Sequence, residues 1–119
     1  MKAMREIDVV PTLRLNIAAG VAIGPGKAAL LDGIANTGSI SRAAKEMGMG
    51  YRQAWAMIDS MNDQFVAPLV ERTKGGPEGG GTKLTPLGVE VLQRYKTMEQ
   101  KAIKAIEKDA RDFEKLLKT

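Results

Sequence analysis

Three consecutive residues, Tyr51, Arg52 and Gln53, are of types that can recognise DNA. An arginine can donate two hydrogen bonds to a guanine, and a glutamine can pair in the same bidentate way with an adenine. A tyrosine can bind a phosphate or pack on a sugar. This chemistry requires the three side chains on the exposed first turn of a helix that enters the major groove.

The segment from Gly38 to Asn62 has the pattern of two helices joined by a tight turn, which would position those side chains. Gly38 can end a preceding helix in the left-handed conformation, and Ser39 or Ser41 can cap the next one. Residues 48–50, Gly-Met-Gly, suit a sharp turn. Apolar residues at helical spacing give each helix a buried face: Ala43, Ala44 and Met47 on the first, and Ala54, Ile58 and Met61 on the second. The pattern predicts a helix-turn-helix with a second helix over 51–62, although two helices of an ordinary bundle would show the same spacing of apolar residues.

A glycine-rich loop follows, between two short segments that we expect to form strands near 69–72 and 83–85. A β-hairpin directly after the recognition helix is the wing of a winged helix, and Arg72, Lys74 and Lys83 would supply charge for phosphate oxygens. A nucleotide-binding P-loop is a poor alternative, because the order around Gly81-Thr82-Lys83 differs from GxxxxGK[ST] and no βαβ unit surrounds it. A plain surface loop remains an open alternative.

Upstream, the sequence predicts a β-hairpin and the first of three helices. Residues 12–18 alternate between apolar and polar, as in a half-buried strand, and residues 21–23 could form a short return strand. We expect Gly24-Pro25-Gly26 to close the hairpin and to open a helix that runs through Asn36. Residues 1–11 are weakly patterned and are expected to form a loose arm.

A long helix is predicted from Thr85-Pro86 to about Leu117, because a capping hydroxyl precedes proline at the first helical position. About 32 residues at ~1.5 Å each span ~48 Å, whereas a compact domain of this size has a radius of gyration of only ~13–14 Å. The helix must therefore overhang the domain or break. An apolar stripe along it predicts dimerisation with a second copy, unless the helix folds back on its own core: Leu92, Tyr95, Ala102, Ile103, Ile106, Ala110, Phe113 and Leu117.

Composition narrows the possible functions. The 119 residues suffice for one domain, the apolar content is 44%, and the net charge of +4 permits a polyanionic partner. The chain has no Cys and no His, which excludes zinc fingers, thiol nucleophiles and imidazole bases. We therefore expect no enzyme activity, no metal site and no cofactor. No apolar run is long enough to span a membrane, and we expect a cytoplasmic protein.

The helix-turn-helix and wing together resemble the N-terminal DNA-binding domain of the molybdate-dependent transcription regulators (the ModE family) and, more distantly, the winged helix of LysR-type regulators. The resemblance covers about residues 12 to 110 and rests on GPGKAALLDGI, YRQAW and the LVER…GG…GGG…LT..G pattern. It implies an α+β, mainly α, winged-helix fold over 1–85 and a dimerisation helix over 86–119. The candidate DNA contacts are Ser41, Arg42, Tyr51, Arg52, Gln53, Arg72, Thr73, Lys74, Gly75, Gly76 and Lys83.

The sequence also departs from that family. Full-length members carry a C-terminal molybdate-binding region, whereas this chain stops at Thr119, so we expect no molybdate site in it. The sequence thus predicts a homodimeric regulator that binds double-stranded DNA at inverted repeats. A winged-helix module that binds a protein instead of DNA is the alternative. The operator, the sign of regulation and any effector do not follow from the sequence.

Overall fold

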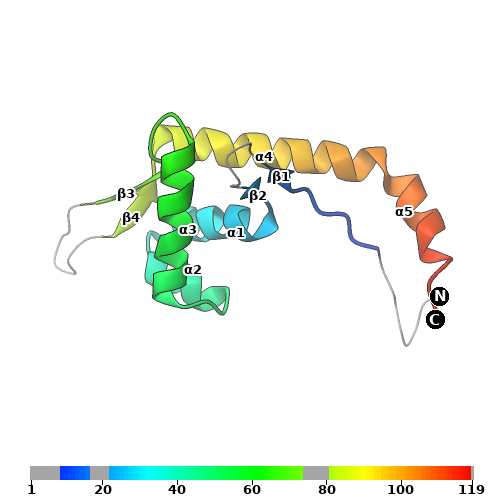
Figure 1. Cartoon of the computed structure of the whole chain (residues 1–119), viewed down its shortest axis with the longest axis horizontal. Coiled ribbons are helices and arrows are strands. Elements are labelled where there is room, and N and C mark those ends of the chain that lie inside the picture. The colour runs from blue at the N-terminus through cyan, green and yellow to red at the C-terminus, as the bar shows by residue number, and fades with distance from the viewer. Residues whose placement is uncertain (1–8, 17–21, 74–80, 119) are drawn as a thin grey trace.

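Five helices and two small antiparallel hairpins make up the computed structural model, which describes residues 9–16, 22–73 and 81–118 (Figure 1). The molecule is elongated, at 53 × 33 × 21 Å with a radius of gyration of 17.3 Å, beyond the ~14 Å of a compact domain of this length. The elements are β1 (Leu15–Asn16), β2 (Ala22–Ile23), α1 (Pro25–Thr37), α2 (Ile40–Glu46), α3 (Tyr51–Gln64), β3 (Val70–Arg72), β4 (Thr82–Leu84), α4 (Pro86–Ala105) and α5 (Glu107–Glu114).

The predicted N-terminal hairpin is present, and its first strand begins at Leu15 rather than at residue 12. β1 pairs with β2 antiparallel over two residues each, with Leu15 opposite Ile23. The alternation predicted along the strand holds where it can be followed, because Leu13 and Leu15 are half-buried and Arg14 is exposed. Residues 1–8 and 17–21 lie outside the described part of the chain, and with them most of the expected loose arm and the hairpin turn.

The core lies where α1, α2, α3 and the first half of α4 meet. Its largest fully buried side chains are Leu30, Leu31, Ile34, Ile58, Met61 and Leu69. Helices α1 and α2 approach closely where Gly33 faces Ala43, because a Cβ built on Gly33 would lie 2.9 Å from the Cβ of Ala43. Real Cβ atoms almost never come that close, so the crossing requires glycine at position 33.

The predicted long C-terminal helix is broken, which is one of the two outcomes that its length allowed. α4 begins after Thr85, whose hydroxyl accepts from the backbone N–H of Gly88 at 3.0 Å. It ends at Ala105, and Ile106, with φ −106° and ψ 9°, separates it from α5. Figure 1 shows α4 running along one edge of the molecule and α5 turning away at its far end. The backbone N–H of Val9 donates to the Glu114 carboxylate at 3.3 Å, which places the start of the described chain beside α5.

The first half of α4 belongs to the winged-helix core. Leu92 and Tyr95 are 6% and 2% exposed, and the Tyr95 hydroxyl donates to the carbonyl of Leu13 at 2.6 Å. These two residues were expected in the dimer seam, but they pack against the core of their own protomer. The segment that was expected to dimerise therefore includes residues that pack within their own protomer, at least as far as Tyr95.

Candidate nucleic-acid interface

The turn between α1 and α2 is set by its caps. Gly38 adopts a left-handed conformation (φ +70°), and its N–H donates to the carbonyl of Ile34 at 2.8 Å. Ser39, rather than Ser41, caps α2, because its hydroxyl accepts from the backbone N–H of Arg42 at 3.1 Å. The side chains of Ser41 and Arg42 are consequently free to lie exposed on the first turn of α2.

The turn between α2 and α3 follows the expected glycine pattern. Gly48 is left-handed (φ +68°), and the N–H of Met49 donates back to the carbonyl of Ala44 at 2.9 Å. Helix α3 then begins at Tyr51 and ends at Gln64, two residues later than predicted. Its buried residues are the three that the spacing indicated, Ala54, Ile58 and Met61.

The first turn of α3 presents Tyr51, Arg52 and Gln53 on the surface, and all three side chains are exposed. The opposite side of the helix is fixed in the core by Ala54 and Ile58, both 0% exposed. The rotation of α3 about its axis is therefore set by packing, and this holds the three polar side chains outward.

The wing is attached to the body at both of its ends. The Asn62 side chain on α3 accepts from the backbone N–H groups of Leu69 and Val70, at 2.7 and 3.3 Å. On the return strand, the N–H of Thr82 donates to the carbonyl of Gly38 at 3.0 Å. Gly81 must be a glycine here, since a Cβ would lie 2.5 Å from that same carbonyl oxygen. The wing is thereby anchored beside the turn that precedes α2.

Strand register decides which wing residues share a face. Arg72 lies directly opposite Thr82, and Glu71 opposite Lys83. Directly opposed residues point to the same side of a hairpin, and neighbours along a strand point to opposite sides. Arg72 and Thr82 therefore face α2 and α3, whereas Lys83 lies on the other face beside Glu71. Both Lys83 and Arg72 were expected to supply charge for phosphate oxygens, and the structure places the two on different faces of the wing. Lys74, Gly75 and Gly76 lie outside the described residues.

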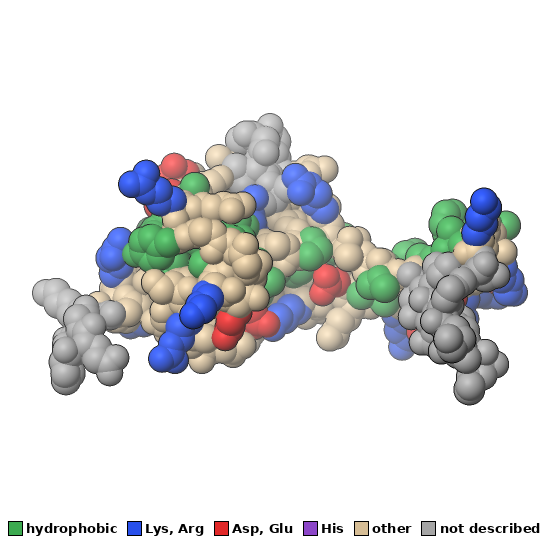
Figure 2. All heavy atoms as spheres, turned by 90° about the horizontal axis from the view of Figure 1, so that it is seen from below, with side chains coloured by type: hydrophobic (Ala, Val, Ile, Leu, Met, Phe, Trp, Pro, Cys, Tyr) green, Lys and Arg blue, Asp and Glu red, His purple; other side chains and the backbone are tan. Residues whose placement is uncertain are grey.

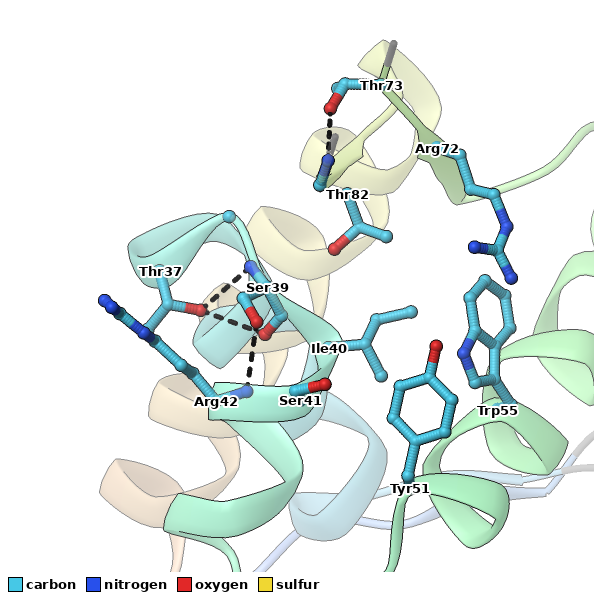
Figure 3. Close-up of a pocket in the computed structure, with 12 residues that line it drawn as sticks. Thr37, Ser39, Ile40, Ser41, Arg42, Tyr51, Trp55, Arg72, Thr73 and Thr82 are labelled. Atoms are coloured by element: carbon cyan, nitrogen blue, oxygen red, sulfur yellow. Dashed lines mark hydrogen bonds between the residues drawn. The ribbon is translucent and has the colours of Figure 1, made fainter. Parts of the chain in front are cut away.

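A cleft of about 530 Å³ lies between the wing, the start of α2 and the start of α3 (Figure 3). It brings together five of the predicted contacts, Ser41, Arg42, Tyr51, Arg72 and Thr73. It leaves out Arg52 and Gln53, which lie exposed on the first turn of α3 but do not line it. Its other lining residues are Thr37, Gly38, Ser39, Ile40, Trp55, Gly81 and Thr82.

Trp55 is the residue that the sequence analysis missed. It follows Tyr51 by one helical turn, so the two lie on the same face of α3, and their rings meet edge to face with centroids 6.4 Å apart. The Arg72 guanidinium lies 4.3 Å from the centroid of the Trp55 ring, in the geometry of a cation–π contact. Figure 3 shows the indole between Arg72 and Tyr51. The sequence signal that could have identified Trp55 is its position four residues after Tyr51.

The charge on this end of the molecule is mixed but basic where the cleft opens. Figure 2, which views the molecule from the side of α2, shows Lys and Arg side chains projecting around the broad end, with some acidic side chains between them. The cleft itself is lined by Arg42 and Arg72 and by no acidic residue among those described. Such a lining favours an anionic ligand.

The remaining seam residues lie on the slender end of the molecule. Ile106 and Phe113 are 43% and 56% exposed, and α5 contains no buried residue in the described chain. Four others are half-buried: Ala102, Ile103, Ala110 and Leu117. No group of His, Cys, Asp or Glu in the described ranges could hold a metal ion, and none of the described helices is long and apolar enough to cross a membrane.

Comparison with known proteins agrees with this geometry. Residues 27–89, just over half of the chain, match the model of the bacterial regulatory helix-turn-helix proteins of the lysR family. The chain belongs to this family. The matched segment runs from α1 through the helix-turn-helix and the wing into the start of α4, and it includes every residue that lines the cleft. The winged-helix expectation is confirmed.

This lysR-family chain is also similar to regulators of the ModE type, the family that its sequence resembles. It is 42% identical to the transcriptional regulator ModE of Yersinia pestis, over 78% of this chain and 36% of that protein. It is 42% identical to the DNA-binding transcriptional dual regulator ModE of Escherichia coli K12, over 70% and 32%. It is 40% identical to the molybdenum-pterin-binding protein MopB of Rhodobacter capsulatus, over 82% and 35%. The chain thus spans about a third of the length of these relatives.

Proposed function

We propose that this lysR-family chain is a DNA-binding transcriptional regulator that inserts the first turn of α3 into a major groove. The observation that carries the proposal is the exposure of Tyr51, Arg52 and Gln53 on a helix whose other face is fixed in the core. Arg52 and Gln53 are the side chains that would read base edges. Sequence-specific readout requires such side chains on a rigid element, because a displaced donor loses its bidentate geometry.

The wing would position the protein without reading sequence. Arg72 faces the recognition helix and its guanidinium is held on Trp55, so it is placed to meet a phosphate that flanks the groove. Two attachments hold the wing strands at a fixed distance from α3, one through Asn62 and one through the carbonyl of Gly38. Lys74, Gly75 and Gly76 would extend this backbone contact along the wing.

We further propose that the regulator acts as a homodimer through the part of the chain after Tyr95. Exposed Ile106 and Phe113 sit on a segment with no buried residue of its own, so a second copy would supply the missing cover. Two-fold symmetry then implies an inverted-repeat operator. Simple helix-turn-helix dimers space half-sites by ~34–36 Å or a multiple, and the long α4 could widen that spacing.

Selection of bound duplexes from a random pool, at a stated salt concentration, tests DNA binding, symmetry and spacing together. On the recovered site, Arg52→Ala should cost about 1–3 kcal/mol and relax preference at one base pair. Equal weakening on every sequence would show that Arg52 contacts only phosphate. No salt-dependent binding to any duplex would refute the proposal and favour a winged-helix module that binds a protein.

A further inference from the structure

Two polar groups in the wall of the cleft have no hydrogen-bond partner among the described residues. They are the hydroxyl Oγ1 of Thr82, whose residue is only 7% exposed, and the indole Nε1 of Trp55. Almost all buried polar atoms in proteins are paired, because an unpaired one has lost its water and gained nothing. A pair of such groups on one cleft therefore suggests a ligand that satisfies them.

The backbone around Thr82 is fixed, so its hydroxyl is not a loosely held group. Its N–H is bound to the carbonyl of Gly38 at 3.0 Å, and the next residue towards the wing tip, Gly81, donates to the Thr73 hydroxyl at 2.9 Å. Thr82 lies opposite Arg72 on the face that looks into the cleft. The unpaired hydroxyl and the guanidinium thus share one wall.

The opposite wall comes from α3. Trp55 lies under the Arg72 guanidinium, and Tyr51, 49% exposed, flanks the indole at the rim of the cleft. Figure 3 shows the nitrogen-bearing edge of Trp55 turned towards Tyr51 and Ile40 rather than away from the cleft. The indole N–H can only donate a hydrogen bond, so its ligand must be an acceptor.

The chemistry of the lining selects a phosphate. The cleft offers two arginines, several hydroxyls and one indole N–H, with no carboxylate among the lining residues to repel an anion. A phosphodiester is negatively charged and has two unesterified oxygens that accept several hydrogen bonds each. The volume of about 530 Å³ is open to solvent between two elements that would flank DNA, so a continuous strand could enter it.

We propose that this cleft holds one backbone phosphate of the bound DNA, with the Thr82 hydroxyl and the Trp55 indole N–H donating to it beside Arg72. Both donor atoms are covered in the free protein, so side chains that line the cleft must shift as the strand enters. The inference rests on the proposed function, since the phosphate belongs to a duplex. It adds a site that fixes the wing and α3 to the same phosphate.

The variant Thr82→Val tests the site, because it replaces the hydroxyl by a methyl group of similar size. A hydroxyl with no partner contributes nothing to folding, so thermal stability should stay the same or rise. Affinity for duplex DNA should fall about tenfold, as expected for one lost hydrogen bond to a charged group. The loss should be equal on specific and random duplexes, with an unchanged salt slope, since no charge is removed. Thr97→Val, at an exposed position on α4, is the matched control and should change neither quantity.

A second measurement locates the phosphate. Neutral methylphosphonate groups placed one at a time along the selected site should weaken wild-type binding most at one position in each half-site. At that position, Thr82→Val and Trp55→Phe should lose less additional affinity than they lose elsewhere, because the contact is already impaired. Additive losses at every position would overturn the assignment.

Two further outcomes separate the inference from the function on which it rests. If the wild-type protein binds duplexes and Thr82→Val binds equally tightly, the phosphate site is wrong and DNA binding stands. If no duplex binds, both fail. Emission of Trp55, the single tryptophan of the chain, should change on adding duplex and not on adding inorganic phosphate at the same ionic strength. A saturable response to inorganic phosphate alone would identify a free oxyanion as the ligand instead.

Discussion

Asn62 is the residue whose removal should separate the wing from the recognition helix. Its side-chain oxygen accepts from the N–H groups of Leu69 and Val70 at 2.7 and 3.3 Å, and its amide nitrogen donates to the carbonyl of Val70 at 3.4 Å. Leu69 and Val70 are 0% and 4% exposed, so water cannot easily replace the lost partner. Asn62→Ala therefore leaves two backbone donors unpaired at the root of the wing.

The expected loss follows from these contacts. The short hydrogen bond to Leu69 contributes about 1 kcal/mol and the longer ones less, while each unpaired buried N–H costs about 1–3 kcal/mol. We expect the free energy of unfolding to fall by about 2–4 kcal/mol in total. For a domain of this size, each kcal/mol lowers Tm by about 4–8 °C, which predicts a drop of about 8–32 °C.

Urea titration and thermal unfolding, both followed by circular dichroism, measure this loss. Asn62→Asp keeps both acceptor contacts and should lose only about 1 kcal/mol. Asn36→Ala, at an exposed position near the end of α1, should leave stability unchanged or slightly higher. A loss below about 0.5 kcal/mol for Asn62→Ala would show that the wing root does not depend on these bonds, and would refute the reasoning.

Two other predictions concern the packing of α4, and a third its far end. Gly88→Ala should destabilise the fold by more than about 2 kcal/mol, since its Cβ would collide with the carbonyl of Leu69. The control Gly26→Ala, which has open space around its Cβ, should not destabilise the fold. Equal unfolding curves for the two variants would contradict this prediction. Burial, and then the nearby Glu99 carboxylate, raise the pKa of Tyr95 above its usual value of 10.0. Because the tyrosine ionises first in the unfolded chain, its contribution to stability is fully present below pH 10 and is lost as the pH rises beyond it. The free energy of unfolding, measured by denaturation from pH 9 to 11, should therefore fall more steeply in wild type than in Tyr95→Phe. Parallel curves for the two proteins would refute this prediction. At the far end of the molecule, the double substitution of Ile106 and Phe113 by glutamate should yield monomers in sedimentation. A charge reversal at exposed Lys108 should leave the dimer intact. A dimer that persists in the double variant would disprove the proposed seam.

The parts of the fold that the sequence predicted well are those set by local signals. Gly38, Ser39 and the Thr85-Pro86 pair marked helix ends because their conformations and caps depend on near neighbours, and each occurs as expected. The exposure of the first turn of α3 followed from the spacing of its buried residues.

The parts that were missed depend on contacts between distant segments. Leu92 and Tyr95 fit a dimer stripe equally well by spacing, and only the packing of α4 on the core shows that they are used within one protomer. The phosphate contact of Lys83 stays a prediction, and only the strand register shows that this residue lies on a different face of the wing from Arg72. Trp55 would pass for a core residue in the sequence, whereas in the structure it joins the wing to α3. The break at Ile106 has neither Gly nor Pro to mark it.

The close crossing of α1 over α2 links the choice of residue at two positions. Gly33 and Ala43 together leave room for one methyl group, and it makes little difference to the available volume which helix carries it. Gly33→Ala alone should force the helices apart, whereas Gly33→Ala combined with Ala43→Gly should recover part of the loss. Homologues that carry alanine at the first position are therefore expected to carry glycine at the second, so the two positions should covary although ten residues separate them.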